Sequence, residues 1–129
     1  EALAGYLVQR LGVQRGDRVL LMSQNCPQYV AAYYGIMRAG AVVVPVNAMC
    51  TQSEIRYYLQ DSGARVAICA QDLLPQMLPL HRQHGATGDD VLDQVVVATY
   101  SDYLQGPSDL RLPDFVTAPR QALSGQGLP

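Results

Sequence analysis

Lysine is absent from the chain: all nine of its basic residues are arginine, in a sequence of 129 residues. A lysine ammonium often grips a phosphate as a point charge or serves as a catalytic group. A mechanism that needs such a lysine therefore cannot be completed within this chain. Tryptophan is also absent, and phenylalanine occurs once beside eight tyrosines. The tyrosines fall mostly at helical packing positions, which argues against a platform for stacked bases.

Neither sign of charge is in large excess, because the net charge is −2 and the isoelectric point is near 5.5. A nucleic-acid-binding or anionic-membrane-binding protein needs a basic surface, so we expect neither partner. The longest apolar run, residues 39–46, is far too short to span a membrane. The hydrophobic share of 49% and the charged share of 16% are typical of a globular domain with one core.

Cysteine is scarce: Cys26, Cys50 and Cys69 form no CxxC pair, and their spacing matches no common zinc site. We interpret them as reduced thiols that pack inside a cytoplasmic protein. The chain opens with neither a signal peptide nor an initiator methionine. We therefore expect it to be a piece of a larger protein.

Motifs of nucleotide and hydrolase chemistry are missing as well. The phosphate-binding pattern GxxxxGK[ST] and the GxSxG setting of a hydrolase nucleophile do not occur. The GQG at residues 125–127 imitates the opening of a dinucleotide fingerprint, but we predict no strand before it and no helix after it.

Two small groups of potential metal ligands also lack the required spacing. His81 and His84 fit one helix face without a third ligand nearby, so we expect solvated residues at a helix end. Asp89, Asp90 and Asp93 lack the alternating oxygen ligands of a calcium loop, and we expect them in a solvated loop. The sequence predicts no metal site.

Alternating helix and strand patterns run through the first part of the chain. Leucines at helical spacing predict a helix that ends at Gly12. A strand is predicted at 18–23, and its continuous apolar run at 19–22 suits a strand covered on both faces, as in a parallel sheet. A helix is predicted over 27–39, with a proline in its first turn and Gly40 at its end. Because apolar residues surround most of this helix, we expect it to be buried on more than one side.

The next segment predicts a second strand and a capped helix. Three valines at 42–44 indicate a strand covered on both faces, which Pro45 ends because proline cannot donate to a ladder. Thr51 and Glu54 form a capping box, in which each side chain bonds the backbone N–H of the other residue. Gly63 provides the C-terminal stop of this helix.

Residues 65–70 complete a strand–helix–strand unit over 42–70, which implies parallel strands and a right-handed crossover. Two prolines make the helix predicted at 71–83 short or broken. A fourth strand follows at 94–99. These elements predict an α/β fold with a mostly parallel sheet and flanking helices.

We expect residues 1–105 to form an α/β subdomain, and residues 106–129, rich in proline, to form an extended linker or crossing segment. In an open parallel sheet, ligands bind outside the carboxyl ends of the strands. Asn25 and Asn47 follow the first two predicted strands at that edge. Each asparagine either contacts a ligand or caps a turn.

With these elements placed, the sequence resembles the N-terminal part of the adenylate-forming acyl-CoA synthetases. The resemblance rests on GDRV at 16–19, RAGA at 38–41, PVN at 45–47, Glu54 and DSGA at 61–64, all in the family's order. Each motif alone is weak, but the ensemble is specific.

The resemblance covers roughly residues 1–72, and residues 91–116 are similar to fatty-acid-type ligases. It implies a parent enzyme that forms an acyl-adenylate from a fatty or other carboxylic acid and ATP, with Mg²⁺. Coenzyme A then displaces AMP. The family's phosphate loop, magnesium glutamate, ribose-binding aspartate and catalytic lysine have no counterpart here, so no catalytic, cofactor-binding or metal-binding residue is assigned.

The resemblance thus implies an inactive scaffold whose main partner is the rest of the synthetase chain. Surface that this partner covers would be exposed in the chain alone, so we expect self-association. A stand-alone flavodoxin-like binding or interaction module is the alternative. A nucleotide-binding oxidoreductase domain is a third and weaker interpretation, since no glycine-rich turn follows any predicted strand.

Overall fold

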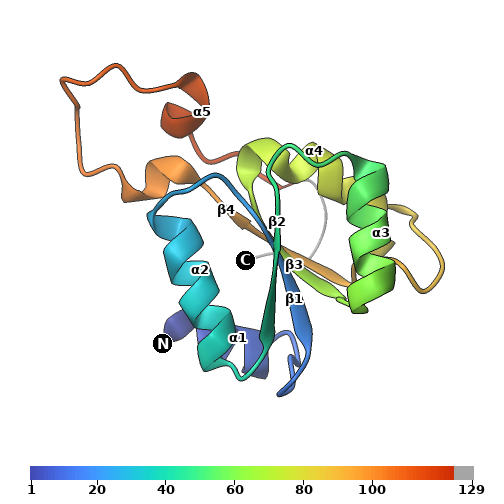
Figure 1. Ribbon diagram of the computed structural model, residues 1–129. Helices are drawn as coiled ribbons and strands as arrows, with labels where there is room; N and C mark the ends of the chain where they lie inside the picture. The colour runs from blue at the N-terminus through green and yellow to red at the C-terminus, as the bar shows by residue number, and fades with distance from the viewer. Residues whose placement is uncertain (124–129) are drawn as a thin grey trace.

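The structure, a computed structural model, describes residues 1–123 and contains one parallel sheet of four strands (Figure 1). The strands are β1 (Arg18–Met22), β2 (Val42–Val46), β3 (Val66–Ala70) and β4 (Gln94–Ala98). Their spatial order is β2-β1-β3-β4, and every neighbouring pair is parallel. The predicted α/β class is confirmed, and this order matches the first four strands of a flavodoxin-like sheet. The GQG at 125–127 lies outside the described residues.

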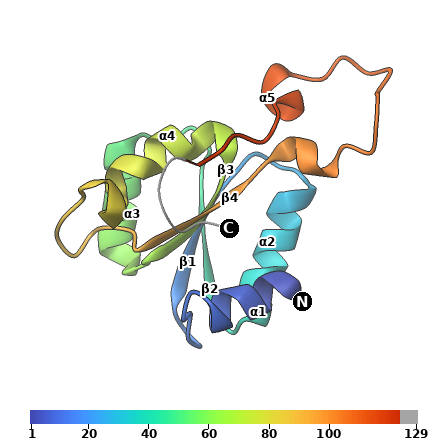
Figure 2. The same ribbon diagram turned by 180° about the vertical axis from the view of Figure 1, so that it is seen from behind.

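Helices cover both faces of the sheet (Figure 1, Figure 2). One face packs against α1 (Ala2–Gln9) and α2 (Pro27–Arg38), and the other against α3 (Gln52–Ser62) and α4 (Leu74–Met77). Side chains alternate along β1, so Leu21 packs toward α2 while Leu20 packs toward α3. The strand covered on both faces that the sequence predicts here is confirmed.

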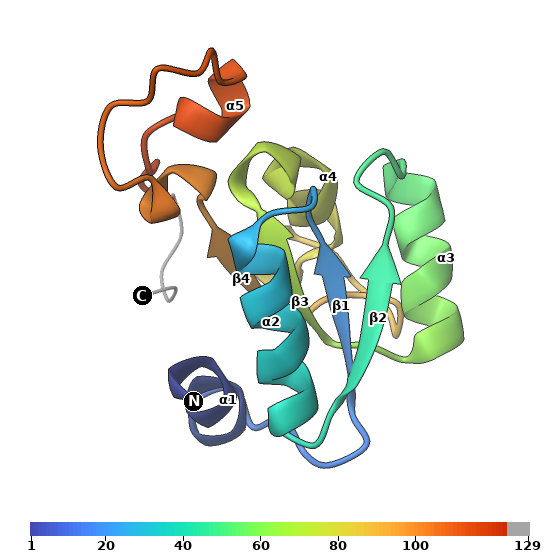
Figure 3. The same ribbon diagram turned by 60° about the vertical axis from the view of Figure 1, so that its left-hand side comes forward.

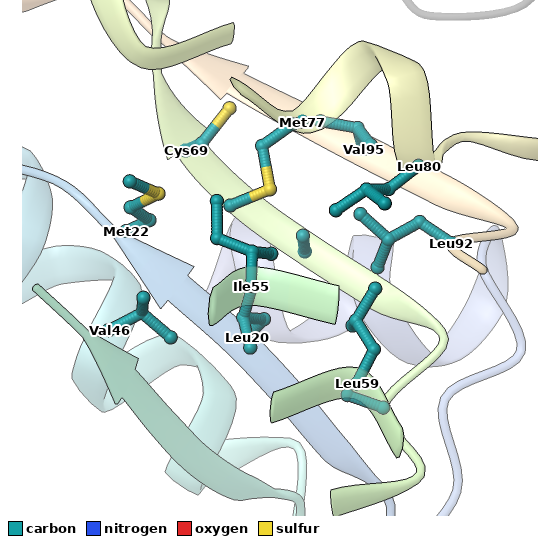
Figure 4. Close-up of a cluster of buried hydrophobic side chains, with 12 residues drawn as sticks. Leu20, Met22, Val46, Ile55, Leu59, Cys69, Met77, Leu80, Leu92 and Val95 are labelled. Atoms are coloured by element: carbon teal, nitrogen blue, oxygen red, sulfur yellow. The ribbon is translucent and has the colours of Figure 1, made fainter. Parts of the chain in front are cut away.

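The larger core cluster lies between the sheet and the α3 and α4 side (Figure 4). Ile55 and Leu59, one helical turn apart on α3, reach the same cluster as Leu20 of β1 and Met77 of α4. All four side chains are 0% exposed. A packed interior relaxes only partly around a truncated side chain, which leaves a cavity. Truncations in this cluster should therefore lower the free energy of unfolding most.

The segment 42–70 forms the predicted strand–helix–strand unit with parallel strands. β2 and β3 are not neighbours, however, because both pair with β1, which lies between them. β1 is therefore a central strand, and β2 and β4 are the two edges of the sheet among the described residues.

The edge position of β2 corrects two expectations about this strand. It is not covered on both faces, since the side chain of Val42 is 50% exposed. Pro45 does not end it either, because the strand continues to Val46 with Pro45 opposite Leu21. An edge strand bonds a neighbour on one side only, so it tolerates a residue without an N–H.

The expectation that α2 is buried on more than one side is also wrong. Its buried residues, Gln28, Ala32 and Ile36, recur every four positions and form one stripe against the sheet. The opposite side exposes large apolar side chains, by 37% to 66%: Val30, Tyr33, Tyr34 and Met37. We call these four residues the outer face of α2.

The capping box at the start of α3 is confirmed. The backbone N–H of Glu54 lies 3.4 Å from Thr51 Oγ1, and the backbone N–H of Thr51 donates to Glu54 Oε2 at 2.7 Å. The Thr51 hydroxyl also donates to Glu54 Oε2, at 2.8 Å. The backbone N–H and the hydroxyl of Thr51 lower the pKa of the Glu54 carboxyl, because both donate to its charged form. The helix ends at Gly63, whose φ of 70° is in the left-handed region that favours glycine.

Substitution Thr51→Ala should lower the free energy of unfolding by about 1 kcal/mol, because a backbone N–H at the start of α3 loses its acceptor. Urea denaturation followed by circular dichroism measures this change. The control is Thr87→Ala, since Thr87 is an exposed loop residue and should change stability by less than about 0.5 kcal/mol. Equal effects of the two substitutions would contradict a stabilising role for the cap.

The helix predicted at 71–83 is broken, as expected from its prolines. It consists of α4 with 3₁₀ turns at Gln71–Leu73 and Leu78–Leu80, and a further turn at Arg82–His84 follows.

His81 corrects the expectation of a solvated histidine, since its side chain is buried. Its Nε2 lies 3.1 Å from the backbone oxygen of Asp93, and its Nδ1 lies 3.1 Å from Nδ1 of His84. A carbonyl oxygen only accepts, so Nε2 of His81 donates to it. His84 is exposed, as expected.

Two of the three clustered aspartates are ion-paired instead of simply solvated. Asp90 Oδ2 accepts from Arg56 Nη1 of α3 at 2.9 Å, and Asp93 Oδ1 accepts from Arg82 Nε at 2.8 Å. Asp89 is exposed. The Arg56 contact joins residues 34 positions apart, which local pattern reasoning does not detect.

The ion pair of Asp90 predicts a pH dependence of stability. The hydrogen bond from Arg56 lowers the pKa of the Asp90 carboxyl below its ordinary value. For an acid whose folded pKa is lowered, the stabilisation is complete above the unfolded value of about 3.9 and is lost as pH falls through the folded value. Asp90→Asn should therefore be less stable than the parent sequence at pH 7, with a difference that shrinks below about pH 4.

Urea denaturation across this pH range tests the prediction. The matched control is the neighbouring Asp89→Asn, for which a change below about 0.5 kcal/mol is expected at pH 7. A difference between Asp90→Asn and the parent sequence that does not vary with pH would contradict the assignment.

The segment after β4, followed to residue 123, folds back toward the carboxyl edge of the sheet (Figure 3). It contains a short helix, α5 (Asp114–Thr117). The ring of Phe115 packs on that of Tyr100, with centroids 5.5 Å apart. Ser101 Oγ donates to the Ala118 carbonyl at 2.8 Å, and Arg120 pairs with Asp102. The assignment of 106–129 to a linker or crossing segment stays a prediction. Within residues 1–123, no helix has the length and apolar character that a membrane span requires.

Candidate binding site at the carboxyl edge of the sheet

All four strands point the same way, so their carboxyl ends meet at one edge of the sheet (Figure 3). The loops that leave this edge hold Gln24 after β1, Asn47 after β2, Gln71 after β3 and Tyr100 after β4. Doubly wound sheets bind ligands at this edge, so we looked here for polar groups that converge.

The structure brings Asn25 and Asn47 to the same cavity, which has a volume of about 340 Å³. Tyr29 of α2 and Pro45 of β2 are also in its wall. Asn47 Oδ1 accepts from the backbone N–H of Met49 at 2.9 Å, which is the bond of an Asx turn. Asn47 therefore does cap a turn. A ligand-binding role for the two asparagines stays a prediction.

A second cavity, of about 480 Å³, shares Gln24 and Asn25 with the first. It lies between the start of α2 and the segment after β4, and we call it the Gln28 cavity. Its wall comprises Gln24, Asn25, Cys26, Pro27, Gln28, Tyr100, Tyr103, Leu104, Phe115 and Val116.

Sequence reasoning missed the role of Gln28 at this edge. Its Nε2 donates to the carbonyl oxygens of Thr99 at 2.8 Å and Tyr100 at 3.0 Å, which tie the start of α2 to the end of β4. A signal was present, because Gln28 is one of two strongly polar residues in an otherwise apolar helix. Such a residue within the buried stripe usually has a specific partner.

Tyr100 extends from the end of β4 to the loop after β1. Its hydroxyl oxygen accepts from the backbone N–H of Gln24 at 3.1 Å, and Ser23 Oγ lies 3.5 Å away. Burial raises the pKa of the phenol, and burial also raises that of the Asp72 carboxyl near it. Successive strands are added on opposite sides of β1, so the strand order reverses between β1 and β3, which is where a flavodoxin-like sheet holds its ligand. Here the Tyr100 side chain bridges that position.

The edge offers hydrogen bonds and apolar surface but few charges. Among the described residues, no charged side chain lines either cavity. In residues 1–123, His, Cys, Asp and Glu nowhere gather in a group of three or more that could hold a metal ion.

Comparisons with known proteins agree with the resemblance that the motifs indicate. Residues 1–119 match the family described as AMP-binding enzyme. A long-chain-fatty-acid–CoA ligase of Bacillus subtilis (strain 168) is 36% identical over 111 residues, which cover 86% of this chain and 19% of that protein. The corresponding ligase of Salmonella typhimurium (strain LT2) is 51% identical over 67 residues, 52% of this chain and 12% of that protein.

The fold is also shared with a solved ligase structure. The anthranilate CoA ligase AuaEII, in complex with anthranoyl-AMP, matches with a TM-score of 0.63 and 30% identity over 74% of this chain. The chain spans 19% or less of the two curated relatives and 18% of this structure. Because the family match extends over residues 1–119, the chain belongs to the AMP-binding enzyme family.

Proposed function

We propose that this chain is the N-terminal scaffold part of an AMP-forming carboxylic acid–CoA ligase. The observation that carries the proposal is the family match over residues 1–119, together with relatives that are named as CoA ligases. In the proposed parent reaction, the acid attacks ATP to give an acyl-adenylate and pyrophosphate. Coenzyme A then displaces AMP and leaves the acyl thioester.

We propose a fatty acid as the substrate of the parent enzyme. Both curated relatives reported above are named long-chain-fatty-acid–CoA ligases, and one is 51% identical over its aligned part. The solved structure named for anthranilate, an aromatic acid, is 30% identical. The names of the two curated relatives favour the aliphatic class.

The role we assign to this part of the parent is structural. Transfer chemistry at a phosphate depends on positioned cations that stabilise negative charge. The chain has no lysine, and neither the cavity at Asn25 and Asn47 nor the Gln28 cavity has a charged wall residue among the described residues. ATP, Mg²⁺ and coenzyme A are therefore proposed to bind the rest of the parent, and no residue here is assigned to catalysis.

The outer face of α2 supports the rest of the parent as the partner. Its four large apolar side chains form an exposed stripe on one helix, and the chain spans 19% or less of its curated relatives. A contiguous apolar surface of this kind is usually an interface. We expect the chain alone to self-associate through this face, and light scattering at rising concentration would show a monomer if the expectation is wrong.

We place the parent in the cytoplasm, because the three cysteines of this chain are all unpaired thiols.

Product analysis of the full-length parent tests the proposed function. The enzyme is incubated with ATP, Mg²⁺, coenzyme A and fatty acids of increasing length, with benzoate and anthranilate as aromatic acids. We expect fatty acyl-CoA and AMP in equal amounts by mass spectrometry and chromatography. ADP as the nucleotide product, or no thioester from any acid, would overturn the reaction class. A clear preference for the aromatic acids would overturn the substrate alone.

A further inference from the structure

We propose that His81 and His84 together bind one divalent transition-metal ion of the Zn²⁺ type, each through its Nδ1. They are the two histidines of the whole chain. Two protein ligands are fewer than the three or four of a usual zinc site, so water completes the coordination. This proposal does not rest on the proposed function, whose Mg²⁺ prefers oxygen ligands and is assigned to the rest of the parent.

The two rings face each other because of the turn that joins them. Arg82–His84 form a 3₁₀ turn, a geometry that eclipses side chains three positions apart. The backbone N–H of His84 donates to the His81 carbonyl at 2.9 Å, and Gly85 ends the turn with a φ of 89°. The ring centroids are 5.4 Å apart and the Nδ1 atoms 3.1 Å apart. The local backbone therefore brings two potential ligand atoms together.

The distance between the two Nδ1 atoms fits two ligands of one ion. Zinc–nitrogen bonds of about 2.0–2.1 Å that meet at about 90–110° place two ligand nitrogens about 2.8–3.4 Å apart. The observed distance of 3.1 Å is inside this range. A hydrogen bond between the rings has the same length, and the ion would take the place of its proton.

The other nitrogen of His81 makes the contact that metal-binding histidines usually make. Nε2 donates to the backbone carbonyl of Asp93 at 3.1 Å. A neutral imidazole has one N–H, so in the neutral ring this bond leaves the lone pair on Nδ1, which faces His84. Histidines that bind metals almost always donate their second nitrogen in this way, which fixes the tautomer and the ring plane. In its neutral form, His81 is therefore already arranged as a ligand.

His81 is fixed in place, whereas His84 can adjust. Leu92 holds the backbone on both sides of His81, because its N–H donates to the Leu80 carbonyl at 2.8 Å and its carbonyl accepts from the N–H of Arg82 at 2.9 Å. The side chain of His81 is 3% exposed. His84 is exposed, so its ring can turn to direct a lone pair at the ion. The ion therefore enters from the His84 side, and His81 does not need to reach solvent.

Both histidines line one cavity of about 230 Å³. This volume holds an ion with several waters, since one water occupies about 30 Å³ of the liquid. Among the described residues its wall contains no carboxylate, and its other polar side chains are those of Gln71, Gln83 and Gln121. Calcium and magnesium prefer carboxylate and other oxygen ligands, while imidazole nitrogen suits zinc, copper and nickel. The cavity therefore selects the transition-metal class.

Zn²⁺ is the probe, because it has no redox chemistry and does not oxidise the three free thiols of the chain. It is titrated into the ¹⁵N-labelled 129-residue chain, and the imidazole nitrogens are followed by NMR. Since the chain has two histidines, the spectrum contains two rings. We expect the Nδ1 signals of both rings to shift and to saturate together with Zn²⁺, and neither to shift with Mg²⁺ at the same concentration.

One variant and one control locate the ion. His84→Ala removes the exposed ligand and leaves the buried ring in place. Loss of a group that only orients a ligand lowers metal affinity by about 10–100-fold, so loss of this ligand should weaken Zn²⁺ binding by at least about tenfold. Thr87→Ala is the control, since Thr87 is exposed in the loop after His84 and does not line the cavity. It should leave the affinity unchanged, and amide spectra show whether both variants are folded.

Joint saturation of both rings by Zn²⁺ that is lost in His84→Ala and kept in Thr87→Ala supports the site. A shift of the His84 ring alone would indicate a surface histidine and would overturn the shared site. Unchanged Zn²⁺ affinity of His84→Ala would overturn it as well. Absence of saturable shifts in the unmodified chain would also contradict the proposal and leave a hydrogen bond between the rings.

Discussion

Substitution Leu20→Ala is expected to lower the free energy of unfolding by about 2–5 kcal/mol. Leu20 is on β1, which pairs with a strand on both sides, and its side chain is 0% exposed in the cluster formed with α3. Truncation removes buried methyl groups and leaves a cavity that a central strand cannot close by moving. The loss is a large share of the roughly 5–15 kcal/mol that stabilises an ordinary domain.

Urea denaturation monitored by circular dichroism measures this loss. The matched control is Leu110→Ala, the same substitution at a leucine that is 74% exposed, and it should change the free energy of unfolding by less than about 0.5 kcal/mol. Similar effects at the two positions would contradict the placement of β1 at the centre of the sheet.

Gln28→Leu is expected to destabilise the chain by an amount on the order of 2 kcal/mol. The substitution removes both donors to the Thr99 and Tyr100 carbonyls, which are buried contacts between the start of α2 and the end of β4. Part of the loss is offset, because the unpaired Oε1 disappears with them. The two lost hydrogen bonds cost more than the removal of one unpaired oxygen gains. The free energy of unfolding should therefore fall.

The control for this substitution is Gln76→Leu, since Gln76 is exposed on α4 and should tolerate the change. Both variants are compared by urea denaturation at pH 7. Stability of Gln28→Leu equal to or above that of the parent sequence would contradict the bridging role of the amide.

Local patterns predict the elements of this fold well. The apolar run of β1 indicates a strand covered on both faces, and Thr51 with Glu54 indicates the start of α3. The prolines after β3 indicate a broken helix. Each of these signals depends on residues within a few positions of one another, so the sequence contains the necessary information locally.

The errors arise where the outcome depends on neighbours in space. The three valines of β2 predict a buried strand, but β2 is at the edge of the sheet. No local pattern distinguishes an edge strand from a central strand here. The outer face of α2 is apolar and yet exposed in this chain. In the proposed parent, another part of the chain covers this face, so apolarity alone overestimates the burial of α2 in these 129 residues.

Local patterns likewise predict some residues of the candidate site and miss others. The rule that ligands bind at the carboxyl edge of parallel strands indicates Asn25 and Asn47, which do lie on one cavity. Gln28 and Tyr100 were missed, because their contacts join residues 71 or more positions apart. Their identification needed the order of the strands, which the motifs do not contain.

The acid-dependent exchange of pyrophosphate into ATP is the measurement that tests the scaffold assignment most directly. The full-length parent and the 129-residue chain are assayed side by side with Mg²⁺ and a panel of fatty acids. We predict exchange by the parent that depends on the acid, and no exchange above background by the chain alone. Exchange catalysed by the chain alone, or its absence from the parent with every acid, would contradict the account.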